Sequence, residues 1–415
     1  MSYIEQGSLL CIAIGIIIMI MSTLLARKNR NLPGKDTVKN PKFAILIPAR
    51  DESKVITGLL SSLKEQTMKI DMKDVYVIVE DKHDPTCKLV ETFHASFIVR
   101  KNLTLQRKGY ALDEAVKQIL KEKKHYDAYF VIDADNVLDS HYLEEMKKVY
   151  DKGYDVGSGY RNLKNGNTNI ISACSGLIFS LINAIGNEDK IKYQQNIVTI
   201  GSGFFVRGDI VEKWGGFPFY SLSEDYEFSL YATLMGYTTY YNKKAMFFDE
   251  QPVTYHETVK QRVRWIRGYF EARKKYIPKL YQKYQEPVQN EGSILGVLVG
   301  IIPYLFIIIG VVIYLLFQLW NLGLEFILKE QIETSILIKL GITFFVIYLV
   351  LLFLTAYILW KERKTINLNT KRKVQALFLH PFYLMTYLPC AIQAFMKKEI
   401  KWEKIEHREE KVVKN

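Results

Sequence analysis

Three short apolar segments in the first third of the chain are each followed within a few residues by acidic side chains. They are Phe43–Ile47 before Pro48-Ala49-Arg50-Asp51-Glu52, Val75–Val79 before Glu80-Asp81, and Tyr129–Ile132 before Asp133-Ala134-Asp135-Asn136. A single acid in such a place is an ordinary turn or helix-cap residue. Three of them, each at the end of a buried strand, would bring carboxylates together at one edge of a sheet. The pattern therefore predicts a ligand site at that edge.

Asp133 and Asp135 are separated by one residue directly after a strand. Two carboxylates on a tight turn suit a hard divalent cation such as Mg²⁺ or Mn²⁺, which takes its other ligands from water and substrate phosphates. Neither glycine-rich phosphate motif, G-x-x-x-x-G-K or G-x-G-x-x-G, occurs in the sequence. A bound nucleotide would then be held through a metal ion and basic side chains. This mode of binding favours a nucleotide substrate whose diphosphate leaves during the reaction.

Two further motifs lie in the second half of the soluble region. Ser221-Leu222-Ser223-Glu224-Asp225-Tyr226-Glu227 places acids at a predicted helix start. A helix start accounts for Ser223 as a cap and for one acid that interacts with the helix dipole. The remaining acids are better explained if one of them is a carboxylate that accepts a proton during catalysis. Gln261-Arg262-Val263-Arg264-Trp265 has two equal interpretations from local composition. Its arginines could snorkel at a membrane surface, or clamp a diphosphate above an indole that stacks on a sugar.

The elements that position these motifs alternate between strand and helix patterns over residues 40–270. Helical periodicity follows the strands at Ser53–Gln66, Lys108–Lys121 and Ser140–Tyr150. A strand–helix alternation of this kind predicts an α/β domain with an open, mostly parallel sheet.

Uncharged runs flank this domain. Residues 6–26 are long enough to cross a membrane, and basic residues follow them rather than precede them, which favours an anchor over a cleaved signal peptide. The runs 292–324 and 340–360 are the next two predicted spans. Acidic residues dominate the loop between them, and basic residues follow Trp360. By the positive-inside tendency the N-terminus is outside and the 40–270 domain is cytoplasmic.

The remaining segments are predicted to lie at the membrane surface. Residues 374–396 contain Pro381 and Pro389 between two basic clusters, which favours a re-entrant or interfacial hairpin over a third helix in a C-terminal membrane region spanning 292–396. Residues 271–291 form a basic, Tyr-rich helix pattern expected on anionic lipid. Residues 397–415 form a basic cytoplasmic tail.

Composition limits the classes of protein that remain. The 415 residues are 49% hydrophobic and carry a net charge of +12, with four widely spaced cysteines. These values exclude a disordered or collagenous chain and support neither a disulfide framework nor a zinc site. Basic residues that flank spans account for much of the charge, so no nucleic-acid partner is expected. A soluble α/β domain with few spans argues against a transporter.

The ordered set of motifs resembles membrane-bound family 2 glycosyltransferases, the group of cellulose, chitin, hyaluronan and poly-N-acetylglucosamine synthases. The resemblance runs from about Ala44 to Gly268 and rests most on Gln-x-x-Arg-Trp downstream of Glu-Asp and Asp-x-Asp. It implies a GT-A-like nucleotide-sugar transferase domain between transmembrane helices.

The resemblance also implies roles for individual residues. Ala49, Arg50 and Glu52, with Asp81 or Glu80, would hold uridine, and Lys108 would lie near the nucleotide. Asp133 would face the donor diphosphate and Asp135 would bind the metal. Asp225 would be the general base, with Glu224 beside it. Gln261 and Arg264 would clamp the diphosphate, and Trp265 would lie under the acceptor sugar near Gly201, Ser202 and Gly203.

The implied activity is inverting transfer from a UDP-sugar, first of all UDP-N-acetylglucosamine, with Mg²⁺ or Mn²⁺. The expected product is a β-linked exopolysaccharide made at the plasma membrane. The span count is low for a polymer synthase, so an accessory membrane subunit is a possible partner beside membrane lipids. Single-sugar transfer to a lipid-linked or cell-envelope acceptor, and a catalytically inactive membrane scaffold, remain as alternatives.

Overall fold

The computed structural model describes residues 2–25, 33–286, 290–329 and 334–397. Its strands are β1 (Phe43–Pro48), β2 (Val75–Val79), β3 (Ser96–Val99), β4 (Ala128–Val131), β5 (Val137–Leu138), β6 (Val156–Leu163), β7 (Phe204–Arg207) and β8 (Thr239–Asp249). Helices of the soluble body are α2 (Ile56–Lys64), α3 (Pro85–Thr92), α4 (Lys108–Lys121), α5 (Tyr142–Asp151), α6 (Ile170–Leu181), α7 (Asp189–Lys192), α8 (Gly208–Trp214), α9 (Glu224–Met235) and α10 (Tyr255–Tyr284). The short 3₁₀ turn η2 (Met72–Asp74) precedes β2, and the π-helix η3 (Ile182–Glu188) joins α6 to α7. The remaining helices are α1 (Tyr3–Leu25), α11 (Glu291–Val299), α12 (Ile302–Lys329), α13 (Thr334–Lys361), α14 (Thr370–Met385) and α15 (Tyr387–Met396).

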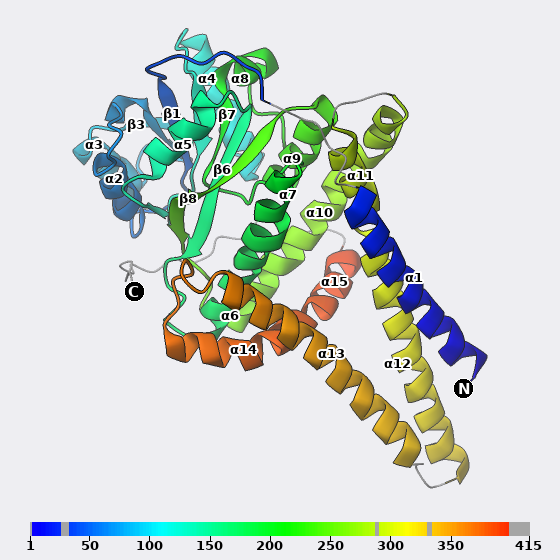
Figure 1. Cartoon of the computed structure of the whole chain (residues 1–415). Helices are drawn as coiled ribbons and strands as arrows, with labels where there is room; N and C mark the ends of the chain where they lie inside the picture. Colours follow the sequence, from blue (N-terminus) through cyan, green and yellow to red (C-terminus); the bar gives the residue numbers. More distant parts are fainter. Residues whose placement is uncertain (1, 26–32, 287–289, 330–333, 398–415) are drawn as a thin grey trace.

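The strands form one mixed sheet in the order β3-β2-β1-β4-β7-β6-β8-β5. The pairs β1–β2, β2–β3, β1–β4 and β6–β8 are parallel, while β7 runs antiparallel to both β4 and β6, and β5 antiparallel to β8. Helices cover both faces of the sheet (Figure 1). The predicted strands Val75–Val79 and Phe43–Ile47 and the predicted helix Lys108–Lys121 match β2, β1 and α4 to within a residue.

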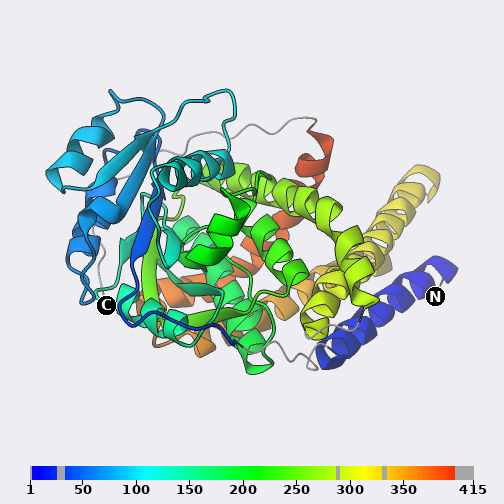
Figure 2. The same cartoon turned by 90° about the horizontal axis from the view of Figure 1, so that it is seen from above.

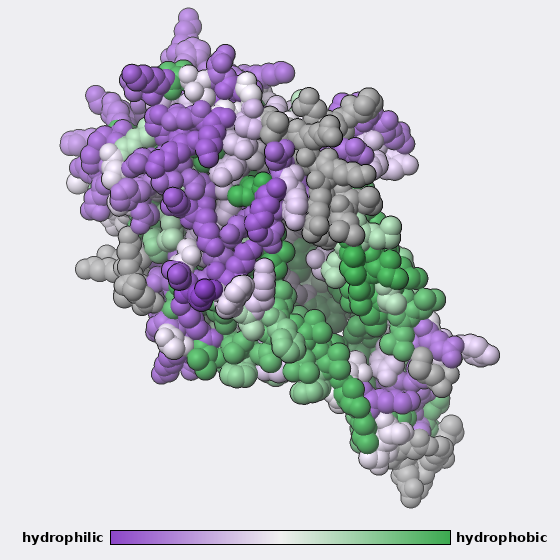
Figure 3. Space-filling view, in the orientation of Figure 1, coloured by the Kyte–Doolittle hydropathy of each residue, from purple (hydrophilic) through white to green (hydrophobic). Residues whose placement is uncertain are grey.

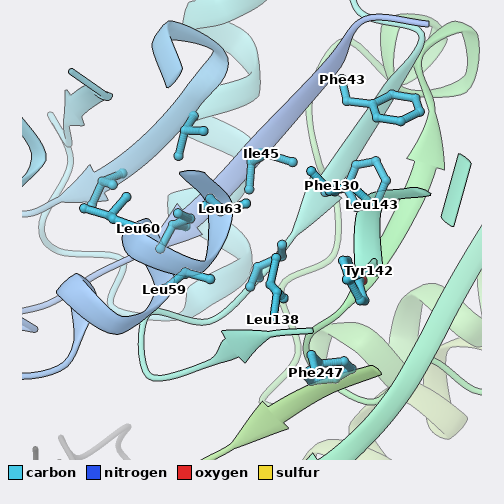
Figure 4. Packing of buried hydrophobic residues seen from close by; sticks show 14 of the residues in the cluster. Phe43, Ile45, Leu59, Leu60, Leu63, Phe130, Leu138, Tyr142, Leu143 and Phe247 are labelled. Carbon is cyan, nitrogen blue, oxygen red and sulfur yellow. The ribbon is translucent and has the colours of Figure 1, made fainter. Parts of the chain in front are cut away.

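Alternation along the strands fills both layers of the core. Phe43, Ile45 and Phe130 point to one face, where they meet Leu59, Leu60 and Leu63 of α2 and Tyr142 and Leu143 of α5 (Figure 4). Ala44, Leu46 and Tyr129 point to the other face, against α4, α8 and α9. Because each fully buried large apolar side chain contributes about 1.5–3 kcal/mol, this two-sided burial fixes the strand register and with it the strand ends.

Four helices in the described residues are long and apolar enough to cross a membrane: Tyr3–Met21, Ile170–Lys192, Glu291–Ile327 and Thr334–Lys361. The first overlaps the predicted run 6–26, and the third and fourth contain the predicted runs 292–324 and 340–360. These stretches belong to α1, to α11 with α12, and to α13, and the helices α1, α12 and α13 project from the soluble body (Figures 1 and 2). Hydrophobic residues gather over these helices, whereas the sheet domain is mainly hydrophilic (Figure 3). Glu5 of α1 accepts hydrogen bonds from Gln318 of α12 at 2.8 Å and Lys339 of α13 at 3.1 Å, which ties the three helices together.

The apolar stretch Ile170–Lys192 was not among the predicted spans. It comprises α6, η3 and α7, and 61% of its most apolar window is buried inside the protein. Leu163, Leu177 and Ala173 pack there against Ile358 of α13 and Ala376 of α14. Its hydrophobicity is therefore explained by packing between the sheet and the helices α13 and α14.

The segments predicted at the membrane surface have clear structures. Residues 374–396 fall in α14 and α15, two helices of 16 and 10 residues that meet at Thr386. Residues 271–284 continue α10 instead of starting a helix of their own, and Ala272, Tyr276 and Leu280 pack against α9 and α11. Lipid contact along that stretch stays a prediction. The tail 397–415 lies, except for Lys397, outside the described residues.

Candidate active site

A cavity of about 410 Å³ lies at the carboxyl edge of the sheet, beneath α10. The predicted site residues on its wall are Ala49, Arg50, Glu52, Glu80, Lys108, Asp133, Asp135, Gly201, Glu224, Asp225, Gln261, Arg264 and Trp265. Asp81, Ser202 and Gly203 are not on the wall. The motifs therefore meet in one place although more than 200 residues separate the first from the last.

The loop after β1 is held from below by the start of α3. Asp84 caps that helix through the Thr86 N–H at 2.8 Å, and its second oxygen accepts the Asp51 N–H at 2.8 Å. Asp51 has φ +55°, a left-handed conformation that Asp tolerates. The turn points Ala49, Arg50 and Glu52 into the cavity.

Of the two acids after β2, Glu80 faces the cavity. Its carboxylate lies 2.9 Å from Arg50 Nε and 3.4 Å from Arg100 Nη1. Arg100 also donates to the carbonyl oxygens of Asn102 and Leu105, at 2.9 and 2.6 Å, and so shapes the loop that leads to α4. Asp81 instead accepts the His83 N–H at 2.9 Å within its own turn. Of the two acids that the sequence left open, Glu80 is the one that lines the cavity.

The turn after β4 is fixed by a buried amide. Asn136 donates to Asp135 Oδ1 at 3.0 Å and to Asp249 Oδ1 at 2.9 Å, and its own oxygen accepts from Ser202 Oγ. Ser202 Oγ in turn accepts the Asp133 N–H at 2.9 Å. Ser202 thus supports Asp133 and Asn136 from behind, which is why it belongs to the site without lining the cavity.

Lys108, the first residue of α4, is the central cation of the cavity. Its ammonium lies 2.5 Å from Asp133 Oδ1, 2.6 Å from the Gly201 carbonyl oxygen and 3.5 Å from Glu224 Oε1. Burial disfavours the charge, but Asp133 and Glu224 outweigh it and raise the pKa of Lys108. Lys108 therefore connects the β4 turn with the start of α9.

The loop that contains Gly201 and Gly203 depends on glycine at both positions. Gly201 and Gly203 have φ of +81° and +65°, which only glycine adopts without strain. A Cβ on Gly203 would lie 2.2 Å from the Phe247 ring, so Gly203 acts through packing behind the cavity. A Cβ on Gly201 would lie 3.7 Å from both Arg161 Nη1 and Asp225 Oδ2. Gly201 therefore lies on the cavity wall next to Asp225.

The acids at the start of α9 divide into two groups. Glu224 and Asp225 line the cavity, whereas Glu227 accepts the Ser221 N–H at 2.8 Å and pairs with Lys275 at 2.5 Å. Ser223 occupies the N-cap position, but its hydroxyl donates to the Trp265 carbonyl oxygen at 3.4 Å and caps nothing. The contacts with Ser221 and Lys275 therefore give Glu227 a structural role, whereas the side chains of Glu224 and Asp225 face the cavity.

Burial shifts the acids of the cavity toward their neutral forms. Burial raises the pKa of Glu224 to about 7. The positive charge of Lys108 lowers this pKa, and the negative charge of Asp225 raises it further. Burial likewise raises the pKa of Asp225, which Lys108, Arg161 and Arg264 oppose. Two adjacent carboxylates with raised pKa values are suited to proton transfer near neutral pH.

The spacing of Gln261, Arg264 and Trp265 puts all three on one face of α10, because residues three and four apart are neighbours on a helix. Gly268 continues that face, and a Cβ there would lie 2.5 Å from Ser223 N. The missing side chain lets α10 approach the start of α9. Arg264 forms no ion pair with any described residue, so its guanidinium is available to an anionic ligand.

Residues that the sequence analysis did not name complete the wall. Arg161 of β6 pairs with Asp249 of β8 at 2.6 Å and donates to the Ile200 carbonyl oxygen at 2.7 Å. Its guanidinium lies 3.6 Å from the centre of the Phe179 ring, which packs edge-on against Trp265 at 5.6 Å. Phe179 comes from α6, and with Ile178 and Ile182 it makes one side of the cavity apolar.

The carboxylates fit a divalent cation only together with a ligand. The described residues contain no group of three acidic, His or Cys side chains arranged to hold an ion by themselves. Asp133 and Asp135 still place hard oxygen ligands on the cavity wall. A Mg²⁺ or Mn²⁺ ion is commonly bound by one or two carboxylates plus substrate phosphates. The residues present match that mode.

The mixed sheet with acids at its carboxyl edge has the architecture of a GT-A-like fold. Residues 130–388 match the family described as "Glycosyl transferase family group 2", and residues 44–215 match "Glycosyl transferase family 2". The chain belongs to glycosyltransferase family 2.

Two curated relatives show the same relationship. The chain is 25% identical over 250 residues to the probable glycosyltransferase YdaM of Bacillus subtilis, covering 58% of each chain. It is 25% identical over 232 residues to the poly-β-1,6-N-acetyl-D-glucosamine synthase of Staphylococcus aureus, covering 54% of each. The matched part thus spans little more than half the length of these relatives.

Among solved structures, the mannosyltransferase PcManGT from Pyrobaculum calidifontis, in complex with GDP-Man and Mn²⁺, superposes with a TM-score of 0.59. The match covers 95% of this chain and 100% of that one at 12% identity. At this low sequence identity the structural match concerns the fold alone, and it confirms the predicted GT-A-like fold.

Proposed function

We propose that this glycosyltransferase moves a sugar from a UDP-sugar to an acceptor hydroxyl, with inversion at the anomeric carbon, on the cytoplasmic side of the plasma membrane. One observation carries the proposal. Glu224 and Asp225, whose pKa values burial raises, line the same cavity as the acids Asp133 and Asp135. The guanidinium of Arg264, which forms no ion pair with the described residues, lies on the same wall. The proposed proton acceptor and the proposed diphosphate-binding groups therefore line one cavity.

The donor would lie across the strand ends. Ala49, Arg50, Glu52 and Glu80 would hold the uridine, because they line the end of the cavity formed by β1 and β2. Gln261 and Arg264 would bind the diphosphate, for which a guanidinium supplies paired donors. Asp135 and Asp133 would hold Mg²⁺ or Mn²⁺, which when bound neutralises charge on the leaving diphosphate.

The transfer step follows from this placement. Asp225 accepts the proton of the acceptor hydroxyl, whose oxygen forms the new bond to the anomeric carbon. The bond between that carbon and the UDP oxygen breaks, and UDP leaves with the electron pair. Arg264 and Lys108 stabilise the developing negative charge from fixed positions. A single displacement inverts the anomeric configuration, so an α-linked donor gives a β-linked product.

The acceptor would stack on Trp265. The similarity to a poly-β-1,6-N-acetyl-D-glucosamine synthase supports UDP-N-acetylglucosamine as donor and a β-linked exopolysaccharide as product. The apolar side formed by Ile178, Phe179 and Ile182 favours a second candidate, transfer of one sugar to a lipid-linked acceptor.

Product analysis separates these candidates. Detergent-purified protein would be incubated with a panel of labelled UDP-sugars and Mg²⁺ or Mn²⁺, and products would be divided into polymer, organic-extractable lipid and free sugar. We expect labelled β-linked polymer from UDP-N-acetylglucosamine. Label confined to the lipid extract would favour the second candidate, and an α-linkage would overturn the inverting mechanism.

A further inference from the structure

Arg262 lies between the clamp residues Gln261 and Arg264 in sequence but points away from the cavity. Only 1% of it is exposed, and it forms no ion pair with the described residues. Its Nη1 donates to Thr386 Oγ1 at 2.6 Å and to the Tyr383 carbonyl oxygen at 3.5 Å, and its Nε donates to the Thr258 carbonyl oxygen at 3.1 Å. A buried guanidinium must be satisfied in this way to be tolerated.

Aromatic rings complete the Arg262 site. The guanidinium lies 4.4 Å from the ring centre of Tyr383 and 5.0 Å from that of Tyr387. Both distances are within the range of cation–π attraction. These rings and Thr386 form the joint between α14 and α15, so Arg262 fixes the joint to α10.

The same face of α10 packs along α15. Val259, Val263 and Ile266 contact Cys390 and Ala394 of α15. Farther along, the rings of Phe270 and Phe395 lie 4.7 Å apart. The helix that carries the donor clamp therefore rests with its opposite face on α14 and α15.

The outer faces of α14 and α15 are apolar and exposed. On α14, Val374, Phe378 and Phe382 recur every four residues and are 53%, 51% and 55% exposed. On α15, Leu388 and Ile392 lie four residues apart and are 46% and 52% exposed. Such rows on short helices are typical of segments that lie in a bilayer interface.

The basic residues around α14 and α15, and the short distance in sequence from α13, indicate which surface these helices contact. Lys371, Arg372 and Lys373 lie in the first turn of α14, and Lys397 follows α15. Lys371 is exposed, whereas Arg372 and Lys373 are half-buried and donate to the Asn167 and Arg363 carbonyl oxygens. α13, which is long and apolar enough to cross a membrane, ends at Lys361, nine residues before α14 begins. The exposed apolar residues of α14 and α15 thus lie between basic residues and close in sequence to the candidate span α13. This combination is suited to contact with an anionic lipid surface.

We propose that α14 and α15 lie on an anionic lipid surface and that Arg262 is the positioning residue through which this surface fixes α10 and the donor clamp. The inference rests on the proposed function, because the clamp is defined by it. Lipid contact holds the α14–α15 joint, Arg262 transmits its position to α10, and Arg264 and Trp265 are aligned on the cavity side.

The test uses the full chain in nanodiscs of zwitterionic lipid, with or without anionic phospholipid, and measures UDP release. For the wild type we expect anionic lipid to raise kcat/KM for the donor by about threefold to thirtyfold. Arg262→Met should lose most of this response and lower kcat/KM on the order of tenfold to a hundredfold through a displaced clamp. Arg262→Lys, which keeps the charge over the rings but loses the paired donors, should fall between.

Further variants keep the result interpretable if Arg262→Met folds poorly. Phe378→Ser with Ile392→Ser changes exposed side chains only, and should abolish the lipid response while leaving the rate in detergent unchanged. Lys213→Met, on α8, removes one exposed charge far from α14 and should respond like the wild type. A wild-type rate that is equal in both lipids, or a lipid response that survives in folded Arg262→Met, would overturn the proposal. A wild type that releases no UDP in any lipid would instead count against the proposed function.

Discussion

Glu80 and Asp81 are neighbours in sequence, yet only Glu80 faces the cavity, where Arg50 holds its carboxylate at 2.9 Å. We expect Glu80→Gln to raise the KM for the donor about tenfold, the cost of weakening one charged hydrogen bond. Asp81→Asn keeps the turn acceptor for His83 and should leave KM within a factor of two. Donor titration of UDP release checks both variants, and the reverse order of effects would contradict the placement of the uridine.

The paired acids of α9 set the pH dependence. Burial raises the pKa of Glu224 to about 7, so the adjacent pair of acids takes up its first proton near that pH. A proton shared between Glu224 and Asp225 lowers the fraction of Asp225 that can act as the base. We therefore expect kcat/KM to decline below about pH 7. Glu224→Gln removes a like charge from beside Asp225, so the acidic limb should move to lower pH. A limb that stays in place in this variant would show that the two acids do not titrate together.

At the scale of elements, the approach of α10 to the start of α9 depends on Gly268. A Cβ there would lie 2.5 Å from the backbone nitrogen of Ser223, so Gly268→Ala must push the helices apart. We expect a loss of about 1–3 kcal/mol in unfolding free energy and a raised donor KM. Gly296→Ala is the matched control, because a Cβ on that helical glycine meets nothing within 4 Å. Thermal unfolding and donor titration report the two effects, and equal behaviour of both variants would contradict the close approach.

The sequence predicted the elements that depend on local pattern. The parallel strands β1, β2 and β4 are continuous apolar runs, and α4 has a regular helical period, so their bounds could be predicted closely. The mixed half of the sheet could not, because β6, β7 and β8 pair through contacts distant in sequence. Arg161 and Asp249, which come from β6 and β8, were missed for that reason. Ser202 was assigned to the acceptor pocket by resemblance, and only the fold places it behind Asp133.

The whole molecule is divided between a hydrophilic body and apolar helices (Figure 3). The proposed orientation places the N-terminal end of α1 outside and the sheet domain in the cytoplasm. Tyr3 is 92% exposed, and Lys121 at the end of α4 is also exposed. In intact cells we expect Tyr3→Cys to react with a membrane-impermeant maleimide, and Lys121→Cys to react only after permeabilisation. These variants are made after Cys11→Ser, and the opposite labelling would reverse the topology.

The central claim is that one cavity combines a general base at Asp225 with donor and metal binding at Asp135. The most direct measurement is UDP release by the purified wild type with UDP-N-acetylglucosamine and Mn²⁺, beside Asp225→Asn and Asp135→Ala. We predict release by the wild type that stops when the ion is chelated and returns when it is restored. Both variants should fall by at least about 10²-fold, the order of magnitude expected for losing a proton-transfer group. Undiminished release by folded Asp225→Asn would contradict the assignment of the base, and with it the account of the site.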